Sequence, residues 1–427
     1  MTPRLLFLMG LYWPMLVAIT GNYTASQIIF ALAMSLTSLF IIAWHRRLND
    51  PRIFWTIVAG FFLATLVASI GLVAGGSITR SLSDGTRFLF LSIYISAGYL
   101  FAISEARSQR AAIRILTTYL IASVLFSTLV YFPSLYPMLD LFKGRLSNDE
   151  LQFHFFRFSG FSGFPTDFGA LLALGLCLIL CDERGAYLSR ATKVALLAVM
   201  TIGLAGSASR GAILHAAAVV GLAASYAALR WITSLRTSRA AALAVLVTPL
   251  CAVLIYSMVQ PFVPEIDAFR YLNVDFDSPD SSVSHRFQEI QGAATVLTEQ
   301  GFLFGRDRDF PLDLPVIEGF WTHLLLRYSW LGLLIGVAMF GWSLRICLGS
   351  GSVLGNALGL WLLGFFLADG LFSDVLFRFK GPFVYGFLFG IVLHQFQVRR
   401  HRGRAHYLVK PVPKEMDGSQ NAEVHGT

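Results

Sequence analysis

The chain is built from repeated apolar runs, most of them about 17 to 22 residues long. A helix rises about 1.5 Å per residue, so runs of this length cross a hydrocarbon core about 30 Å thick. Hydrophobic residues make up 56% of the 427 residues and charged residues only 14%, whereas soluble chains carry about 25% charge. The pattern excludes a soluble multidomain protein and predicts an all-α polytopic membrane protein.

We expect about 12 transmembrane helices, because the apolar runs are separated by polar or basic connections. The first run has the length of a signal peptide, but no small-residue cleavage site follows it, so we interpret it as an uncleaved span. The predicted spans are 4–20, 26–44, 53–73, 88–104, 112–132, 167–181, 194–208, 211–229, 240–259, 321–343, 353–372 and 382–396.

The placement of Lys and Arg predicts the orientation, because basic residues concentrate in short cytoplasmic loops. A cytoplasmic N-terminus puts the basic or mixed connections on the cytoplasmic side, namely those near 45–52, 104–114, 182–193 and 230–239 and the tail after 398. An even number of spans then places both termini in the cytoplasm. The opposite orientation would put the most basic connections outside, and we reject it.

These patterns divide the chain into five segments. N-terminal spans occupy 1–132, and 133–259 holds further spans with external arginine motifs. An external loop domain lies at 260–320, between the ninth and tenth spans, and its apolar residues include a set at the spacing of an amphipathic helix. C-terminal spans follow at 321–398, and 399–427 is expected to be a basic, disordered cytoplasmic tail.

The net charge of +8 does not indicate a nucleic-acid partner. Its densest cluster directly follows an apolar run, where anionic lipid headgroups are the natural partner. This cluster consists of Arg399, Arg400, Arg402 and Arg404. The four cysteines form no CxxC motif, so we expect no disulfide, zinc or redox centre. Membrane lipids are therefore an expected partner.

Four arginines depart from the orientation rule. Arg157, Arg210, Arg286 and Arg327 fall on the predicted external side, at or near the ends of spans. Each is costly beside hydrocarbon unless it pairs with an anion. Guanidinium groups that converge from these segments would bind a diphosphate through bidentate hydrogen bonds. In the alternative interpretation, each side chain reaches to lipid headgroups or pairs with a local carboxylate.

His323 opens the tenth predicted span, and Arg327 lies one turn further along the same face. A neutral histidine at a membrane boundary can act as a base for a hydroxyl group; the alternative is a structural role. Asp275 and Asp277 form an Asp-x-Asp pair in an acidic loop, which we interpret as a solvated turn. We therefore expect no bound metal and no cofactor.

Three short pieces of the chain resemble the O-antigen ligase and polymerase superfamily of bacterial inner-membrane glycan transferases. Their order, the number of spans and the large external loop also resemble that superfamily. The pieces are RFSGFSGFPTDFG at 157–169, SRGA at 209–212, and SHRFQEI at 284–290 followed by THLLLRYSWLGLL at 322–334.

This resemblance implies a membrane-embedded glycosyltransferase of the C type that acts on the periplasmic face of the bacterial inner membrane without a metal. The implied donor is an oligosaccharide linked through diphosphate to undecaprenol. Carried over residue by residue, Arg210 and Arg286 would hold the diphosphate, and Arg157 would help to bind it. We expect Arg327 also to bind the substrate, because it is one of the four external arginines and lies one turn from His323. His323 would orient or deprotonate the acceptor hydroxyl, and the anomeric configuration would invert.

The function that we expect is a repeat-unit polymerase, which transfers the glycan to a lipid-linked acceptor. The acidic second external loop favours it over the close alternative, an O-antigen ligase that acts on phosphorylated lipid A–core. A chain-length regulator is a further candidate partner. A twelve-span transporter or flippase is the alternative from another class; it predicts charges buried within spans, whereas the clearest charges here fall at the predicted span ends.

Overall fold

The structure is a computed structural model. It describes residues 2–13, 23–73, 78–130, 158–162, 165–183, 185–207, 209–234, 291, 319–370 and 380–408. Nearly all of these residues are helical, and none of them forms a strand. The prediction of an all-α chain is therefore confirmed for the part of the chain that the structure describes.

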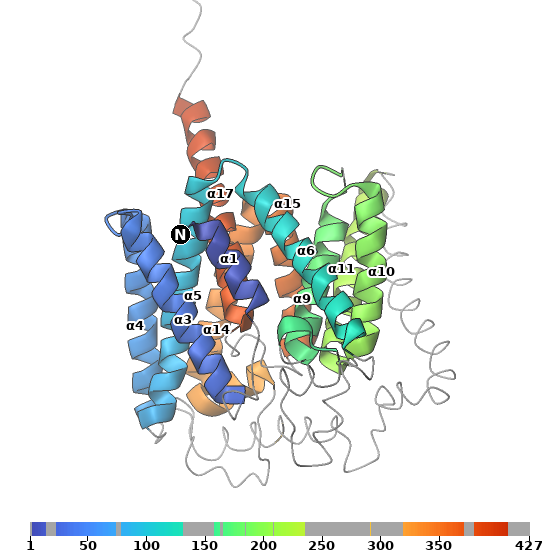
Figure 1. Cartoon of the computed structure of the whole chain (residues 1–427). Coiled ribbons are helices and arrows are strands. Elements are labelled where there is room, and N and C mark those ends of the chain that lie inside the picture. The colour runs from blue at the N-terminus through green and yellow to red at the C-terminus, as the bar shows by residue number, and fades with distance from the viewer. Residues whose placement is uncertain are drawn as a thin grey trace, which may run out of the picture.

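The helices stand side by side in one bundle (Figure 1). In chain order the described elements are α1 (Pro3–Tyr12), α3 (Tyr23–Trp44), α4 (Pro51–Val73), α5 (Ile78–Ser104), α6 (Ser108–Leu129), the 3-10 turn η2 (Gly160–Ser162), α9 (Pro165–Cys181), α10 (Arg190–Ser207), α11 (Arg210–Ser234), α14 (Phe320–Gly349), α15 (Val353–Gly364), the π-helical turn η5 (Phe365–Asp369) and α17 (Lys380–Leu408). Every predicted span except 240–259 coincides at least partly with one of these helices. The span 240–259 and most of the loop domain 260–320 lie outside the described residues.

Six of the described helices are long and apolar enough to cross a membrane. Their outward surfaces carry large apolar side chains; on α4, for example, Trp55, Phe61 and Phe62 are each 64–67% exposed. Aromatic faces of this kind are stable against hydrocarbon rather than water. The chain is thus a membrane-embedded helical protein, while the number of twelve spans stays a prediction.

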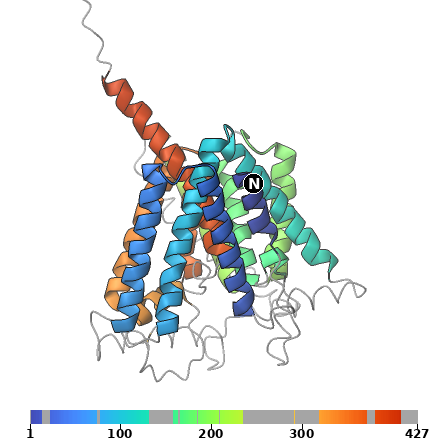
Figure 2. The same cartoon turned by 60° about the vertical axis from the view of Figure 1, so that its left-hand side comes forward.

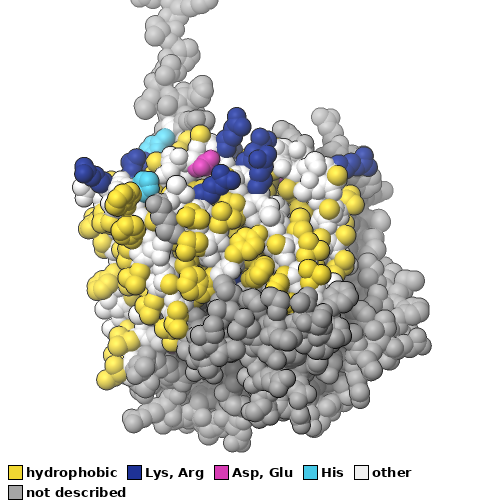
Figure 3. Space-filling model, in the orientation of Figure 1, with side chains coloured by type: hydrophobic (Ala, Val, Ile, Leu, Met, Phe, Trp, Pro, Cys, Tyr) yellow, Lys and Arg dark blue, Asp and Glu magenta, His cyan; other side chains and the backbone are white. Residues whose placement is uncertain are grey.

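Basic side chains gather along one edge of the bundle, the upper edge in Figure 3. We call it the basic edge and define it by the short connections α3–α4, α5–α6, α9–α10 and α14–α15, which lie there (Figure 1). Arg46, Arg107 and Arg190 are exposed in these connections or beside them. The opposite edge holds the first turns of α5, α9, α11, α14 and α17.

The core is centred on α17, which packs along α5. Phe383 and Phe387 of α17 form the middle of an aromatic cluster with side chains from α1, α3 and α5. The Phe7 and Phe387 rings are stacked with centroids 4.5 Å apart, and Tyr94 meets Phe383 edge-on at 5.1 Å. Figure 2 shows that the C-terminal part of α17 projects beyond the other helices.

The start of the C-terminal tail differs from the prediction. Residues from 399 were expected to be disordered, but α17 continues as a helix to Leu408. Extending an existing helix needs no new nucleus, and Arg and Ala favour the helical state. The remaining residues, 409–427, lie outside the described part of the chain.

The α9–α10 connection is held by one buried carboxylate. Asp182 is 1% exposed; its Oδ1 accepts from the Ala186 N–H at 2.9 Å and its Oδ2 from the Leu188 N–H at 2.9 Å. Lys193 Nζ lies 3.5 Å from Oδ2 and also donates to the Asp182 carbonyl. The loop therefore closes around Asp182.

Replacing Asp182 with alanine should lower the free energy of unfolding by about 1–3 kcal/mol, because two N–H groups lose their acceptor and Lys193 loses its ion-pair partner. Thermal unfolding of the purified protein in detergent measures the effect. The control is Glu183→Ala, which removes the same charge from the exposed neighbouring residue and should change stability by less than about 0.5 kcal/mol. Equal effects of both variants would contradict the assignment.

Candidate functional site

The structure describes the predicted site residues only in part. Arg157 and Arg286 lie outside the described residues. Arg210 is the first residue of α11, and Arg327 lies in α14, about two turns from its start. For both residues the structure describes the main chain and not the side chain. The predicted convergence of four guanidinium groups therefore stays a prediction.

The start of α14 packs against the π-helical turn η5 at the opposite edge. The Phe320 and Phe365 rings meet edge-on with centroids 5.4 Å apart. The Trp321 and Phe366 rings meet in the same way at 4.9 Å. π-helical turns are rare and often occur at functional sites.

The start of α11 reaches the same turn through His215. The His215 ring lies 6.4 Å from the Phe365 ring and 5.4 Å from the Trp361 ring. Its Nε2 is 2.9 Å from the Trp361 carbonyl oxygen, so Nε2 carries the proton that it donates. Trp361 Nε1 in turn donates to the Ala170 carbonyl at 2.8 Å. His215 thus has a structural role, linking α11 through α15 to α9.

These contacts bring two of the three motif regions to one place. The helix that begins at Arg210 and the helix that carries His323 in its first turn both pack on η5. In the third motif region, 157–169, the first residue that the structure describes is Phe158, which directly follows Arg157. Its N–H donates to the Gly206 carbonyl at 2.8 Å, shortly before Arg210 along the chain.

His323 is buried rather than open to solvent. Its side chain is 5% exposed, and its neighbours Thr322 and Leu324 are each 4% exposed. A substrate hydroxyl would therefore have to reach His323 inside the bundle. The burial fits a base that is shielded from water as well as a structural histidine, the two interpretations that the sequence left open.

A buried cation that the sequence did not predict lies at the start of α17. Lys380, the first residue of α17, is 1% exposed. Its Nζ donates to the Phe161 carbonyl at 2.8 Å and to the Trp13 carbonyl at 3.2 Å, and lies 5.6 Å from the Tyr119 ring centroid. It therefore ties α17 to the end of α1, to η2 and to α6. The only signal in the sequence was a single lysine directly before the last apolar run.

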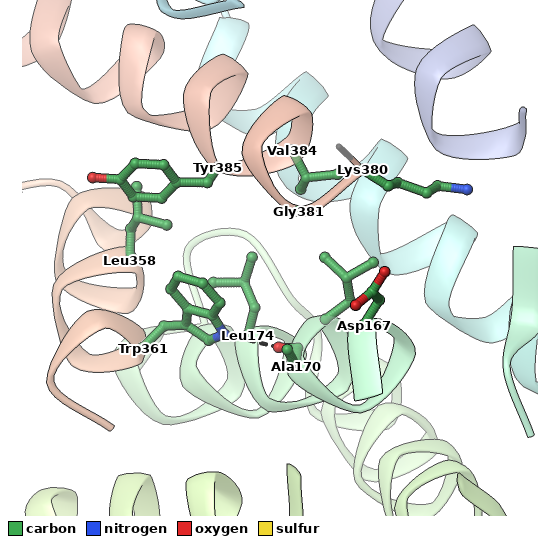
Figure 4. A pocket seen from close by; sticks show the side chains of 10 residues that line it. Asp167, Ala170, Leu174, Leu358, Trp361, Lys380, Gly381, Val384 and Tyr385 are labelled. Atoms are coloured by element: carbon green, nitrogen blue, oxygen red, sulfur yellow. Dashed lines mark hydrogen bonds between the residues drawn. The ribbon is translucent and has the colours of Figure 1, made fainter. Parts of the chain in front are cut away.

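Asp167 interacts electrostatically with Lys380 from the first turn of α9. Figure 4 shows the two side chains at one end of a small pocket, with Trp361 and Tyr385 toward the other end. The pocket measures only about 10 Å³, room for about one water molecule. The pair links the first turn of α9 to the start of α17.

A second group of buried charges lies in the first turns of α5. The sequence predicted an external connection up to residue 87, but α5 already begins at Ile78. Asp84 is 3% exposed; its Oδ2 accepts from the Tyr328 hydroxyl at 2.7 Å, and its Oδ1 lies 3.6 Å from Arg87. Asp84 and Arg87 lie in the first two turns of the candidate span Ser81–Ser104, near its end, and the i,i+3 ion pair offsets their charges there.

Metal ligands are not grouped in the described part of the chain: no three His, Cys, Asp or Glu side chains there could hold one ion. Asp275 and Asp277 lie outside the described residues. The fold and these buried charges define the class of the chain as a helical membrane protein. In comparisons with known proteins, no family model and no curated protein matches the chain.

Proposed function

We propose that the chain is a repeat-unit polymerase: a glycosyltransferase of the C type with twelve spans, which transfers a glycan from undecaprenyl diphosphate to a lipid-linked acceptor. The observation that carries the proposal is the meeting of two motif regions at η5. One helix begins at Arg210 and the other carries His323, and both pack on this turn. These are the segments that resemble the O-antigen ligase and polymerase superfamily.

The charge distribution supports an orientation for this site. Short cytoplasmic loops are rich in Lys and Arg, which assigns the basic edge and both termini to the cytoplasm. The opposite edge, with the starts of α11 and α14, then faces the periplasm. A lipid-linked donor in the bacterial inner membrane would present its diphosphate at that edge.

The chemistry follows from the proposed roles. The acceptor hydroxyl oxygen attacks the anomeric carbon, and His323 takes the hydroxyl proton. The bond from the anomeric carbon to the phosphate oxygen breaks, and undecaprenyl diphosphate leaves with the electron pair. Arg210 and Arg286 stabilise the charge that develops on the diphosphate, and Arg157 and Arg327 help to hold it. A single displacement inverts the anomeric configuration.

Reconstitution tests the proposal directly. The purified full-length chain is placed in vesicles that contain an undecaprenyl-diphosphate-linked repeat unit, without an ion gradient. We expect glycans of increasing length on gel electrophoresis. Translocation of the repeat unit without lengthening would refute the polymerase. Transfer onto added lipid A–core, with no lengthening in its absence, would identify a ligase instead.

A transporter or flippase is the second candidate, and the intramembrane charges favour it. The Asp84–Arg87 pair lies within α5, and Lys380 is buried at the start of α17. Ionisable groups inside spans are typical of transport pathways. The same vesicles separate the two candidates, because a flippase moves the lipid-linked unit across the bilayer and leaves its glycan unchanged.

A further inference from the structure

An apolar cavity of about 140 Å³ lies between α4 and α5 on one side and α14, α15 and α17 on the other. The helix segments around it include four of the six that are long and apolar enough to cross a membrane, namely those of α4, α5, α14 and α17. Its wall is dominated by aliphatic and aromatic side chains, among them Val67, Phe88, Leu91, Trp321, Ile335 and Phe340.

The ionic group in this wall is neutralised. Arg87 lines the cavity, but Asp84 lies 3.6 Å from it and accepts a hydrogen bond from Tyr328. A wall of this composition disfavours an ion or a sugar, because the polar groups of such a ligand would lose water without gaining partners. A hydrocarbon chain has no hydrogen bonds to water to lose, and it gains apolar contacts in the cavity.

The cavity adjoins the candidate site. Phe320 and Phe365 line the cavity, and they are also the pair that joins the start of α14 to η5. The Phe365 ring also lies beside His215 in α11, the helix that begins at Arg210. A ligand with a diphosphate at the start of α11 and a hydrocarbon chain attached to it would therefore reach both places.

We infer that this cavity holds the first isoprene units of the polyprenyl chain of the donor lipid. The inference rests on the proposed function and adds a binding site for the tail to the proposed site for the diphosphate. A single unsaturated chain joined to a diphosphate fits the arrangement, because the apolar space lies beside Phe365 of η5, and the helix that begins at Arg210 packs on the same residue.

Photo-cross-linking tests the inference with purified full-length protein in lipid nanodiscs. The probe is undecaprenyl diphosphate without a glycan, carrying a diazirine on an isoprene unit next to the diphosphate. We expect mass spectrometry to find the label on the cavity-facing residues of α14 or α5. Labelling confined to helices that do not line the cavity would overturn the inference.

A matched pair of variants on α14 sharpens the test. Ile335 faces the cavity, and Ile335→Trp should fill part of it and weaken probe binding about tenfold. Leu334 is 66% exposed on the outward face, and Leu334→Trp should leave the affinity within about twofold. If Ile335→Trp does not fold, Met339→Phe introduces a smaller aromatic group into the same wall.

Two further results would overturn the inference: unchanged affinity in a folded cavity variant, or displacement of the probe by an equal concentration of phosphatidylglycerol. The second result would assign the cavity to ordinary phospholipid. Failure of the proposed function gives a different result. In that case the probe still labels the cavity and Ile335→Trp still weakens binding, but no glycan lengthening occurs in vesicles.

Discussion

Replacing Gly98 with alanine should separate α5 from α17 and prevent the chain from reaching a stable fold. A methyl group at Gly98 would overlap the Phe387 carbonyl oxygen and lie 2.7 Å from the carbonyl carbon. Main-chain atoms of a helix cannot rotate aside as the end of a side chain can, so the helices themselves must move apart. We expect a loss of about 3 kcal/mol or more.

The control is Gly341→Ala in α14. No atom lies within 4 Å of a methyl group placed at Gly341, and alanine favours the helix over glycine by about 0.5–1 kcal/mol. This variant should be as stable as the parent chain or slightly more stable. Size-exclusion chromatography and thermal unfolding in detergent compare the two. If both variants had the same melting temperature, the close approach of α5 and α17 would be wrong.

The contact at Gly98 matters because α5 and α17 each fix other parts of the bundle. A second glycine, Gly390 of α17, lets the same helices approach, since a methyl group there would lie 2.6 Å from the Tyr99 nitrogen. Through Asp84, α5 is bonded to Tyr328 in α14. Through Lys380, α17 is bonded to the ends of α1 and η2. A shift between the two helices would therefore disturb both groups of contacts.

The sequence predicts the helices well because each is an apolar run of sufficient length. It fails at α5, whose first turns carry Asp84 and Arg87 and therefore do not look apolar. It also treats 353–372 as one continuous span and misses the π-helical turn at 365–369. A π turn differs from an α-helix in its i→i+5 hydrogen bonds and has no characteristic residue composition, so it is recognised from the folded structure and not from the sequence.

The sequence predicts those parts of the candidate site that are marked by a short motif of neighbouring residues. The segments around Arg210 and His323 were recognised by short motifs, and the structure brings their helices together at η5. Lys380 and Asp84 were missed because their partners are remote in the chain. Lys380 bonds to a residue 219 positions away, and Asp84 to one 244 positions away. Pairing at such separations depends on the packed fold.

Arg210→Ala should reduce glycan lengthening in the reconstituted vesicles at least about a hundredfold, as the loss of one preorganised charge-stabilising donor does in other enzymes. In the proposed mechanism this guanidinium bonds the diphosphate most strongly as the leaving group gains charge. Arg286→Ala should have an effect of the same size. Arg210→Lys should rescue little, because a point charge cannot form the paired hydrogen bonds of the guanidinium fork.

Arg190→Ala provides the matched control. Arg190 is also the first residue of a helix, α10, but it is exposed and lies at the basic edge. Its loss removes the same charge from the same kind of helix position, far from η5, and should leave the rate of glycan lengthening within about twofold. The proposed diphosphate site would be refuted if Arg210→Ala and Arg286→Ala, inserted in the membrane in normal amounts, made glycans of the parental length. Equal losses in Arg190→Ala and Arg210→Ala would instead point to a general effect of net charge on the folded protein.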